Sequence, residues 1–406
     1  MQKIKYIDNN PQKGIKIDWN MIFKEYKKLG CPENVYDPTT FPVNVVNWGV
    51  LLSARYRGKT TNWILIGLLL FKHYGIQTGY IRQTDRMTTS TKTKDLMNVV
   101  LQFDYIPKIF GDKWNGVYLW QKHYYLCKRD AEGKIEEKCQ EDFLMLLSID
   151  KNIEYKSTLT KPKMDLLLFD EFISDKYAPN EFIDLCQIIA TIKRKRTSVK
   201  VICLSNMVTP YSQYLEEMGL RDTALKYNQW KEEVKNEEEG YSRIVETILG
   251  LKIYFEVVGG KKYKRDAAEV HANMSYFGFA NKQLSAITGE DWEVRNYPHL
   301  PRPEEEEERE LITREVYIYA FGTYLCMEFY VSNIMGNYVL IRPYPLRVPD
   351  DGIIFTDQIP TKQNEIYGTG TGTNFHKLWN LVGAHRDFYS SNEVGHMVES
   401  FLSTVE

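Results

Sequence analysis

Two short segments of the chain carry residue types suited to phosphate chemistry. The first is Gly58-Lys59-Thr60, which follows an apolar run and a short polar loop and precedes a second apolar run. Phosphate is bound by backbone N–H groups at a helix N-terminus, by a flexible lysine that meets the β and γ oxygens, and by Mg²⁺ held on a hydroxyl. The pattern therefore predicts an ATP and Mg²⁺ site whose nucleotide-binding loop comprises Ser53, Ala54, Arg55, Tyr56, Arg57, Gly58, Lys59 and Thr60.

This loop departs from the full phosphate-loop pattern at one place. The pattern starts with a glycine five residues before the second glycine, and here Ser53 stands at that position. Serine enters a positive-φ turn only at some cost, so we expect the loop to be less pre-formed than a glycine-rich one. A lone Gly-Lys-Thr tripeptide also arises by chance. The loop by itself leaves its function open.

The second segment is MDLLLFDE, from Met164 to Glu171, an apolar strand that ends in two acids. Asp170 is placed to hold magnesium, directly or through water, and Glu171 to polarise an attacking water. The alternative is a strand that simply ends in exposed acids. A carboxylate directly after the aspartate is typical of ATPases with an additional catalytic glutamate, and the intervening chain leaves room for an extra strand.

Two further segments each have an ordinary and a functional interpretation. The strand from Val199 ends in Ser205-Asn206. In such folds this strand lies beside the strand of the phosphate loop, so Asn206 can sense the γ-phosphate, although serine and asparagine also favour plain turns. Arg194 lies in a basic run at a helix C-terminus, where it either complements the helix dipole or reaches the nucleotide of a neighbouring subunit.

The elements that position these residues alternate along the chain. VVNWGVLL, Thr78–Arg82, MDLLLFD and VKVICLSN read as strands, while TNWILIGLLLFKHY, a segment near Asp95–Phe103 and NEFIDLCQIIATIKRKR read as helices. A hairpin is expected about AEGK. Strands that alternate with helices predict a mostly parallel α/β sheet covered on both faces.

Changes in composition divide the chain into three segments. Residues 1–258 are predicted to form an N-terminal arm and an ATPase domain, 259–310 a charged linker, and 311–406 a small α+β domain with a long strand from Val316 to Val331.

The net charge of only -2 means that any nucleic-acid surface is a local patch. Six scattered cysteines favour a reducing compartment. No apolar run approaches the roughly 20 residues that a helix needs to cross a bilayer, so we expect neither a membrane-spanning segment nor a membrane partner.

Taken together, the motifs resemble one family. LLSARYRGKT, LLLFDEFISDKYAPNEF and IKRKRTSVKVICLSN, within Val45–Asn206, are similar to the genome-packaging ATPase (encapsidation protein) of small podophages, a relative of terminase large subunits. The resemblance implies an additional-strand P-loop ATPase fold and a ring of identical subunits, a pentamer, that moves double-stranded DNA into a procapsid through its portal. It also implies possible use of a packaging RNA, and a location in the host cytoplasm with transient docking on the procapsid.

Carried over by position, the family's roles fall on the residues already singled out. Lys59 and Thr60 grip phosphate and metal, Asp170 holds magnesium, Glu171 activates water, and Arg194 acts in trans on the neighbouring site. Asn206 joins the predicted catalytic set because of its place at the end of its strand, as the γ-phosphate sensor, and not through the resemblance.

The resemblance also implies that the C-terminal domain is a ribonuclease H-like nuclease fold without its catalytic acids. Two-metal nucleases need a carboxylate cluster. Here the strand Val316–Val331 carries only Glu328, and Asp350, Asp351 and Asp357 fall in turn-rich sequence. We therefore expect no nuclease activity, and binding of DNA, packaging RNA or the portal instead.

Candidate DNA contacts are basic residues that meet phosphates without reading bases. They are Arg86, Lys92, Lys94, Lys261, Lys262 and Lys264, each of which can equally be a solvated surface residue. Two rival functions are less favoured than the motor: a P-loop helicase or recombination ATPase, which should carry further helicase motifs after Asn206 where we see none, and a non-catalytic structural protein with a decayed phosphate loop. Retention of Lys59, Thr60, Asp170 and Glu171 together argues against decay.

Overall fold

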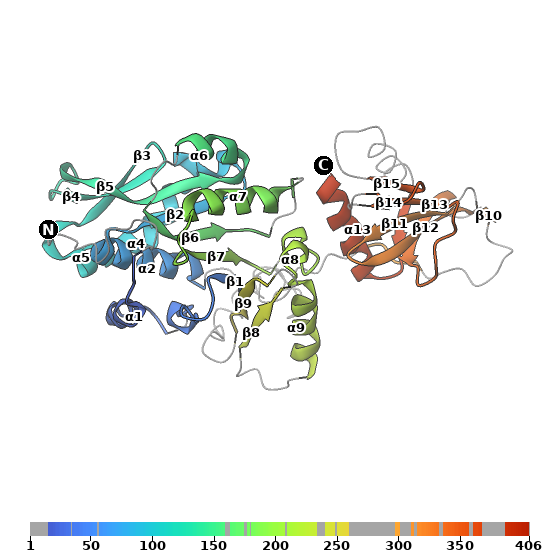
Figure 1. The fold of residues 1–406 in the computed structure, drawn as a ribbon, viewed down its shortest axis with the longest axis horizontal. Coiled ribbons are helices and arrows are strands. Elements are labelled where there is room, and N and C mark those ends of the chain that lie inside the picture. Colours follow the sequence, from blue (N-terminus) through green and yellow to red (C-terminus); the bar gives the residue numbers. More distant parts are fainter. Residues whose placement is uncertain are drawn as a thin grey trace. The chain divides into compact units, whose positions relative to one another are not determined.

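The computed structural model describes two compact units (Figure 1). The described residues are 15–33, 35–54, 57–158, 163–173, 177–178, 180–207, 209–233, 240–247, 250–259, 297–300, 310–311, 315–332, 336–356, 360–367 and 386–405. Within these, the first unit takes residues up to 173, 181–207 and 222–259, and the second takes 177–180, 209–221 and 297–405. Most of the predicted linker lies outside the described residues, so the predicted domain boundaries stay predictions.

The first unit is built on a nine-stranded sheet in the order β3-β4-β5-β2-β6-β7-β1-β9-β8. The strands are β1 (Trp48–Leu52), β2 (Gln77–Arg82), β3 (Gly116–Trp120), β4 (His123–Arg129), β5 (Ile135–Ser148), β6 (Met164–Asp170), β7 (Lys200–Ser205), β8 (Tyr241–Glu246) and β9 (Lys252–Val257). The central strands from β5 to β9 in this order run parallel. The antiparallel strands β3, β4 and β8 lie at the two edges.

The position of β7 confirms the predicted fold class. Strand β7 pairs in parallel with both β6 and β1, so it lies between the strand that ends in the acids and the strand that leads into the phosphate loop. This is the additional strand of the predicted ATPase fold. All these parallel strands end at one edge of the sheet, where ligands bind in open α/β sheets.

Helices cover both faces of this sheet. They are α1 (Trp19–Lys28), α2 (Lys59–Tyr74), α3 (Ser90–Thr93), α4 (Asn98–Gln102), α5 (Tyr105–Phe110), α6 (Asn152–Thr158), α7 (Glu181–Lys193) and α9 (Arg221–Glu233). Short 3₁₀ turns occur at η1 (Pro38–Thr40), η2 (Asp85–Thr88), η3 (Lys94–Met97), η4 (Gly111–Lys113) and η5 (Ile149–Lys151). In Figure 1, α2 and α7 lie on opposite faces of the sheet.

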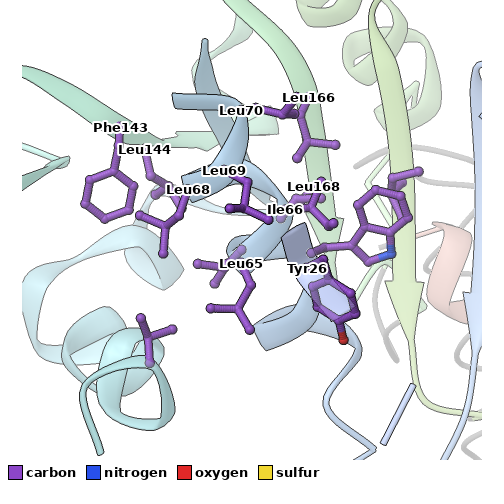
Figure 2. Close-up of a cluster of buried hydrophobic side chains, with 14 of the residues drawn as sticks. Tyr26, Leu65, Ile66, Leu68, Leu69, Leu70, Phe143, Leu144, Leu166 and Leu168 are labelled. Carbon is purple, nitrogen blue, oxygen red and sulfur yellow. The ribbon is translucent and has the colours of Figure 1, made fainter. Parts of the chain in front are cut away.

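Helix α2 is the centre of the first unit's core. Its segment from Trp63 to Leu70 is buried throughout, because the sheet covers one side of the helix and α1 covers the other. Figure 2 shows Leu65, Ile66, Leu68, Leu69 and Leu70 of α2 beside Tyr26 of α1 and Phe143, Leu144, Leu166 and Leu168 of the sheet. This burial fixes the N-terminus of α2, which begins at Lys59, against the carboxyl edge of the strands.

In its described residues, the second unit has a mixed sheet and the long helix α13. The strand order is β15-β14-β11-β12-β13-β16, and β10 pairs with β12. The elements are α8 (Gln213–Glu217), β10 (Glu310–Leu311), β11 (Val316–Ala320), β12 (Thr323–Ser332), β13 (Gly336–Pro343), β14 (Ile353–Thr356), β15 (Glu365–Tyr367), β16 (Arg386–Tyr389) and α13 (Asn392–Val405). Both the α+β character and the closing helix agree with the sequence prediction.

The single long strand predicted from Val316 to Val331 is wrong. The segment forms a hairpin, in which β11 and β12 are joined by Phe321-Gly322. Both of these residues have positive φ, at 51° and 73°, which is the backbone of a two-residue hairpin turn. A second such turn joins β3 to β4 through Gln121 and Lys122.

Among the described helices, none is long and apolar enough to cross a membrane.

Candidate nucleotide-hydrolysis site

The structure brings the sequence-predicted residues of both motifs to one edge of the sheet. The Thr60 hydroxyl, in the first turn of α2, donates to Oδ2 of Asp170 at the end of β6 over 3.0 Å. The backbone N–H of Ser53 donates to the carbonyl of Ser205 over 3.2 Å, so the loop starts beside the end of β7. Asn206 therefore lies next to the phosphate loop as predicted, and its γ-phosphate role stays a prediction.

Gly58 makes the sharp entry into α2 possible. It caps the helix in the left-handed conformation at φ 70°. A Cβ at this position would meet Asn62 and Val35 at 3.2 Å. Residue 57 also receives a hydrogen bond of 2.8 Å from the Tyr36 backbone N–H, so the segment before β1 supports the loop. Arg55 and Tyr56 lie outside the described residues.

Lys59 is held inside the loop by Ser53. Its ammonium donates to the Ser53 hydroxyl over 2.5 Å and approaches the Ser53 carbonyl at 3.4 Å. The Ser53 hydroxyl in turn donates to the carbonyl of Ala54 over 2.8 Å, which leaves its lone pairs for the lysine. Burial lowers the pKa of Lys59 to about 8. The serine that departs from the phosphate-loop pattern is thus a direct partner of the lysine that the pattern requires.

Three donors hold the carboxylate of Asp170. Its Oδ2 accepts from Thr60 and, over 2.7 Å, from the Tyr80 hydroxyl, while its Oδ1 accepts from the Glu171 backbone N–H over 3.1 Å. Burial raises the pKa of Asp170, and the hydrogen bond from Tyr80 acts in the opposite direction. A carboxylate and a hydroxyl oxygen this close together are ligands that suit Mg²⁺.

Glu171 stands at the surface of the site in a strained backbone. Its φ is 54°, a left-handed value that a non-glycine residue adopts at a cost and that recurs at functional sites. Its side chain is 61% exposed and forms an ion pair with Arg82, which is only 15% exposed. The carboxylate is therefore open to water on one side and held by a guanidinium on the other.

Sequence reasoning missed two residues of this site, Tyr80 and Arg82. Both lie on β2, which pairs with β6, and they project from the same face because they are two residues apart. The available signal was an aromatic hydroxyl and a cation at the end of an otherwise apolar strand. The sequence does not show that this strand neighbours the one ending in Asp170. It therefore does not show what these two side chains contact.

Arg194 and Arg196 have different environments. Arg196 forms a 2.7 Å ion pair with the buried Asp165 and donates to the carbonyls of Met164 and Ile192. Arg194 is exposed and ends α7 with φ 50°. Because Arg196 contacts the first residue of β6, this basic run lies at the opposite end of that strand from Asp170, about 20 Å away at the usual rise per residue.

The predicted DNA contacts are only partly described. Arg86 and Lys92 are exposed on η2 and α3, which follow the carboxyl end of β2 on the same side as the site. The side chain of Lys94 and all of Lys261, Lys262 and Lys264 lie outside the described residues. DNA binding by these six residues stays a prediction.

Comparisons with known proteins agree with the sequence motifs. A model of the family described as Podovirus DNA encapsidation protein (Gp16) matches residues 144–236. Over 57 residues the chain is 40% identical to the DNA packaging proteins of Bacillus phages PZA and phi29, and this stretch is 13% of the chain and 17% of each relative. The matched family segment contains Asp170, Glu171, Arg194 and Asn206 but not the phosphate loop.

A solved structure extends the likeness to most of the chain. The structure titled the Phi-28 gp11 DNA packaging motor covers 92% of this chain and 98% of its own, with 16% identity and a TM-score of 0.52. This similarity shows the fold. The predicted resemblance is confirmed: the chain is similar to podovirus DNA encapsidation proteins.

Proposed function

We propose that this protein is a viral packaging ATPase that hydrolyses ATP to move double-stranded DNA into a procapsid. The observation that carries the proposal is the 3.0 Å contact between Thr60 and Asp170, with Lys59 next to Thr60 and Glu171 next to Asp170 at the same edge of the sheet. The similarity of residues 144–236 to a DNA encapsidation family supports the biological setting. ATP is the expected nucleotide.

The residues present fit a Mg²⁺–ATP complex. The N-terminus of α2 begins at Lys59, so its free backbone N–H groups and the lysine face the place where phosphates bind. Thr60 and Asp170 would hold the magnesium, which when bound neutralises charge on the β and γ phosphate oxygens. Lys59 must leave Ser53 to reach the phosphates, so nucleotide binding replaces a hydrogen bond to a neutral hydroxyl by an ion pair with a phosphate oxygen.

Glu171 is the residue that would orient and polarise the attacking water. It is exposed to solvent, and its backbone N–H is fixed on Asp170, so the base and the metal ligand move as one. Its carboxylate is held in an ion pair by Arg82. We infer that this ion pair must loosen for the carboxylate to act as a base, because the carboxylate must turn away from the guanidinium to contact an attacking water.

We propose that Arg194 serves the site of a neighbouring subunit. About 20 Å of strand β6 separates its end of α7 from Asp170, which is beyond the reach of an arginine side chain. An arginine supplied in trans stabilises charge in the transition state of phosphoryl transfer. The proposal therefore includes a ring of identical subunits, a pentamer by family resemblance, in which each subunit completes the site of the next.

The second unit is proposed to bind nucleic acid or the portal rather than to cut DNA. Glu315, Cys326 and Glu328 form a group of possible metal ligands. Both oxygens of the buried Glu328 are occupied, one by Arg342 at 2.6 Å and the other by the Tyr330 hydroxyl at 2.6 Å. The guanidinium supplies the positive charge that metals would supply in a nuclease, which supports the absence of two-metal cleavage.

The remaining parts of the proposal concern partners and place. Double-stranded DNA and the portal of a procapsid are the expected partners, together with a packaging RNA if this phage uses one. The protein would act in the host cytoplasm, docked on the procapsid during packaging. The matches to phage packaging proteins support this setting.

The test is ATP turnover by the purified chain with and without double-stranded DNA. We expect turnover that DNA stimulates and that Glu171→Ala abolishes, and we expect Lys59→Ala to lose nucleotide binding as well. Absence of both binding and turnover would favour a decayed phosphate loop. Turnover stimulated only by single-stranded DNA would favour the helicase alternative.

A mixing experiment tests the trans arginine separately. Arg194→Ala subunits retain Glu171, while Glu171→Ala subunits retain Arg194. If each site uses its neighbour's arginine, mixing the two inactive variants restores part of the turnover. Inactivity of the mixture at every ratio would contradict the trans arrangement.

A further inference from the structure

Tyr80 occupies an unusual place in the site. It lies on β2, the residue is only 4% exposed, and its hydroxyl donates to Oδ2 of Asp170 over 2.7 Å. In the sheet, Tyr80 is paired with Leu168, two residues before Asp170, so both side chains project from the face that α2 covers. The hydroxyl therefore meets the carboxylate in the space beneath the N-terminus of α2.

The direction of the hydrogen bonds at Tyr80 is fixed by its two polar neighbours. The guanidinium of Arg82 can only donate, and it lies 3.4 Å from the Tyr80 oxygen. The carboxylate of Asp170 can only accept. The Tyr80 hydroxyl must therefore give its proton to Asp170 and turn its lone pairs toward Arg82. Burial raises the pKa of Tyr80 well above its usual value, so it keeps the proton that it donates.

This bond restrains a side chain that otherwise turns easily. The last torsion of an aspartate has a broad energy profile, so the packing of Asp170 alone does not orient its oxygens. Thr60 and Tyr80 both hold Oδ2, and the Glu171 backbone N–H holds Oδ1. Of these donors, Thr60 would itself become a metal ligand, which leaves Tyr80 as the side-chain donor that does not change its role.

We propose that Tyr80 is a positioning residue of the magnesium site, which holds the carboxylate of Asp170 in line with the Thr60 hydroxyl. Through Arg82, which contacts both Tyr80 and Glu171, the same hydroxyl links the metal ligand to the water-activating acid. This inference rests on the proposed function only in that a Mg²⁺–nucleotide complex binds here. Hydrogen-bond partners behind a metal ligand typically change metal affinity about 10- to 100-fold when they are removed.

The test is Tyr80→Phe, which removes one oxygen and keeps the ring. Binding of a fluorescent ADP analogue is titrated in EDTA and then over a series of Mg²⁺ concentrations. We expect affinity in EDTA to stay within about twofold of wild type, because no phosphate contact is lost, and the Mg²⁺ concentration for half-maximal enhancement to rise about tenfold. In turnover, the expected change is a higher KM for Mg²⁺ with kcat largely recovered at saturating Mg²⁺.

Tyr124→Phe is the matched control. Tyr124 is buried in the same unit and donates its hydroxyl to the carbonyl of Thr93 over 2.6 Å, away from the site. Both variants lose one buried hydrogen bond, so their melting temperatures should fall by similar amounts, and only Tyr80→Phe should change the Mg²⁺ dependence. An unchanged Mg²⁺ dependence, or an equal change in both variants, would overturn the inference. If wild type binds no nucleotide, the proposed function itself fails, and the inference fails with it.

Discussion

Replacing Ser53 by alanine should tighten nucleotide binding. The buried Lys59 ammonium donates to the Ser53 hydroxyl over 2.5 Å, and a nucleotide must break this bond. A hydrogen bond that involves a charged group contributes about 1.5–3 kcal/mol, and the Ser53 carbonyl at 3.4 Å retains part of it in the variant. A net gain of about 1.4 kcal/mol is a tenfold lower Kd, which is the magnitude we expect.

The assay is calorimetric titration of ADP into wild type and Ser53→Ala, with Ser53→Gly as a second variant that restores the residue of the full pattern. Lys59→Met is the control, because in that background the serine has no ammonium to hold, and adding Ser53→Ala should then change the melting temperature less than it does beside Lys59. Weaker binding in Ser53→Ala at an unchanged melting temperature would refute this reasoning. It would show that the hydroxyl contacts the nucleotide rather than competing with it.

The remaining predictions concern catalysis and stability. Glu171→Gln should lower turnover about 10²- to 10⁴-fold while ADP affinity stays within about twofold, and a parallel loss of ADP binding would contradict its role as a base. Arg196→Met should destabilise the first unit by about 3–5 kcal/mol in denaturant unfolding, because Asp165 is left buried and unpaired, whereas the exposed Arg194→Met should have little effect. Equal stability of these two variants would count against the structural role of Arg196. Glu256 has a pKa raised to about 7 by burial, above its ordinary 4.5. Its stabilising contribution is therefore fully present below pH 4.5 and is lost as pH rises through about 7, and the upper bound of this loss is about 3 kcal/mol. Glu256→Gln should flatten the fall in stability between pH 5 and pH 8, and an unchanged pH profile would contradict the assignment.

The site residues that lie within short contiguous motifs were predictable from the sequence. Lys59 and Thr60 stand at a strand-loop-helix junction, and Asp170 and Glu171 end an apolar strand. Parallel strands bring such ends to one edge, so spacing and burial alone place the two motifs together. The contact between Thr60 and Asp170 confirms this placement.

The contribution of β2 was not predictable, because strand order is a property of the whole fold. Tyr80 and Arg82 matter only since β2 lies beside β6. The role of Ser53 was not predictable from the sequence either. The sequence shows a missing glycine, whereas the structure shows a hydroxyl that binds Lys59.

The hairpin in the second unit was missed for a local reason. Two-residue hairpin turns are usually marked by Asn-Gly or Asp-Gly, because both central residues need positive φ. Phe321 has a positive φ here although phenylalanine is not a usual residue of such turns. Because its side chain is apolar, the sequence pattern predicted one continuous strand in place of the two strands of the hairpin. Packing of this unit outweighs the local preference of phenylalanine.

The central claim is that ATP hydrolysis at this site moves double-stranded DNA. Its most direct measurement is ATP-driven displacement of a third strand from a DNA triplex by the full-length protein, beside Glu171→Gln. We predict displacement by wild type that requires hydrolysable ATP and is absent in Glu171→Gln. DNA-stimulated hydrolysis without any displacement, at every protein concentration that forms a ring, would contradict the account.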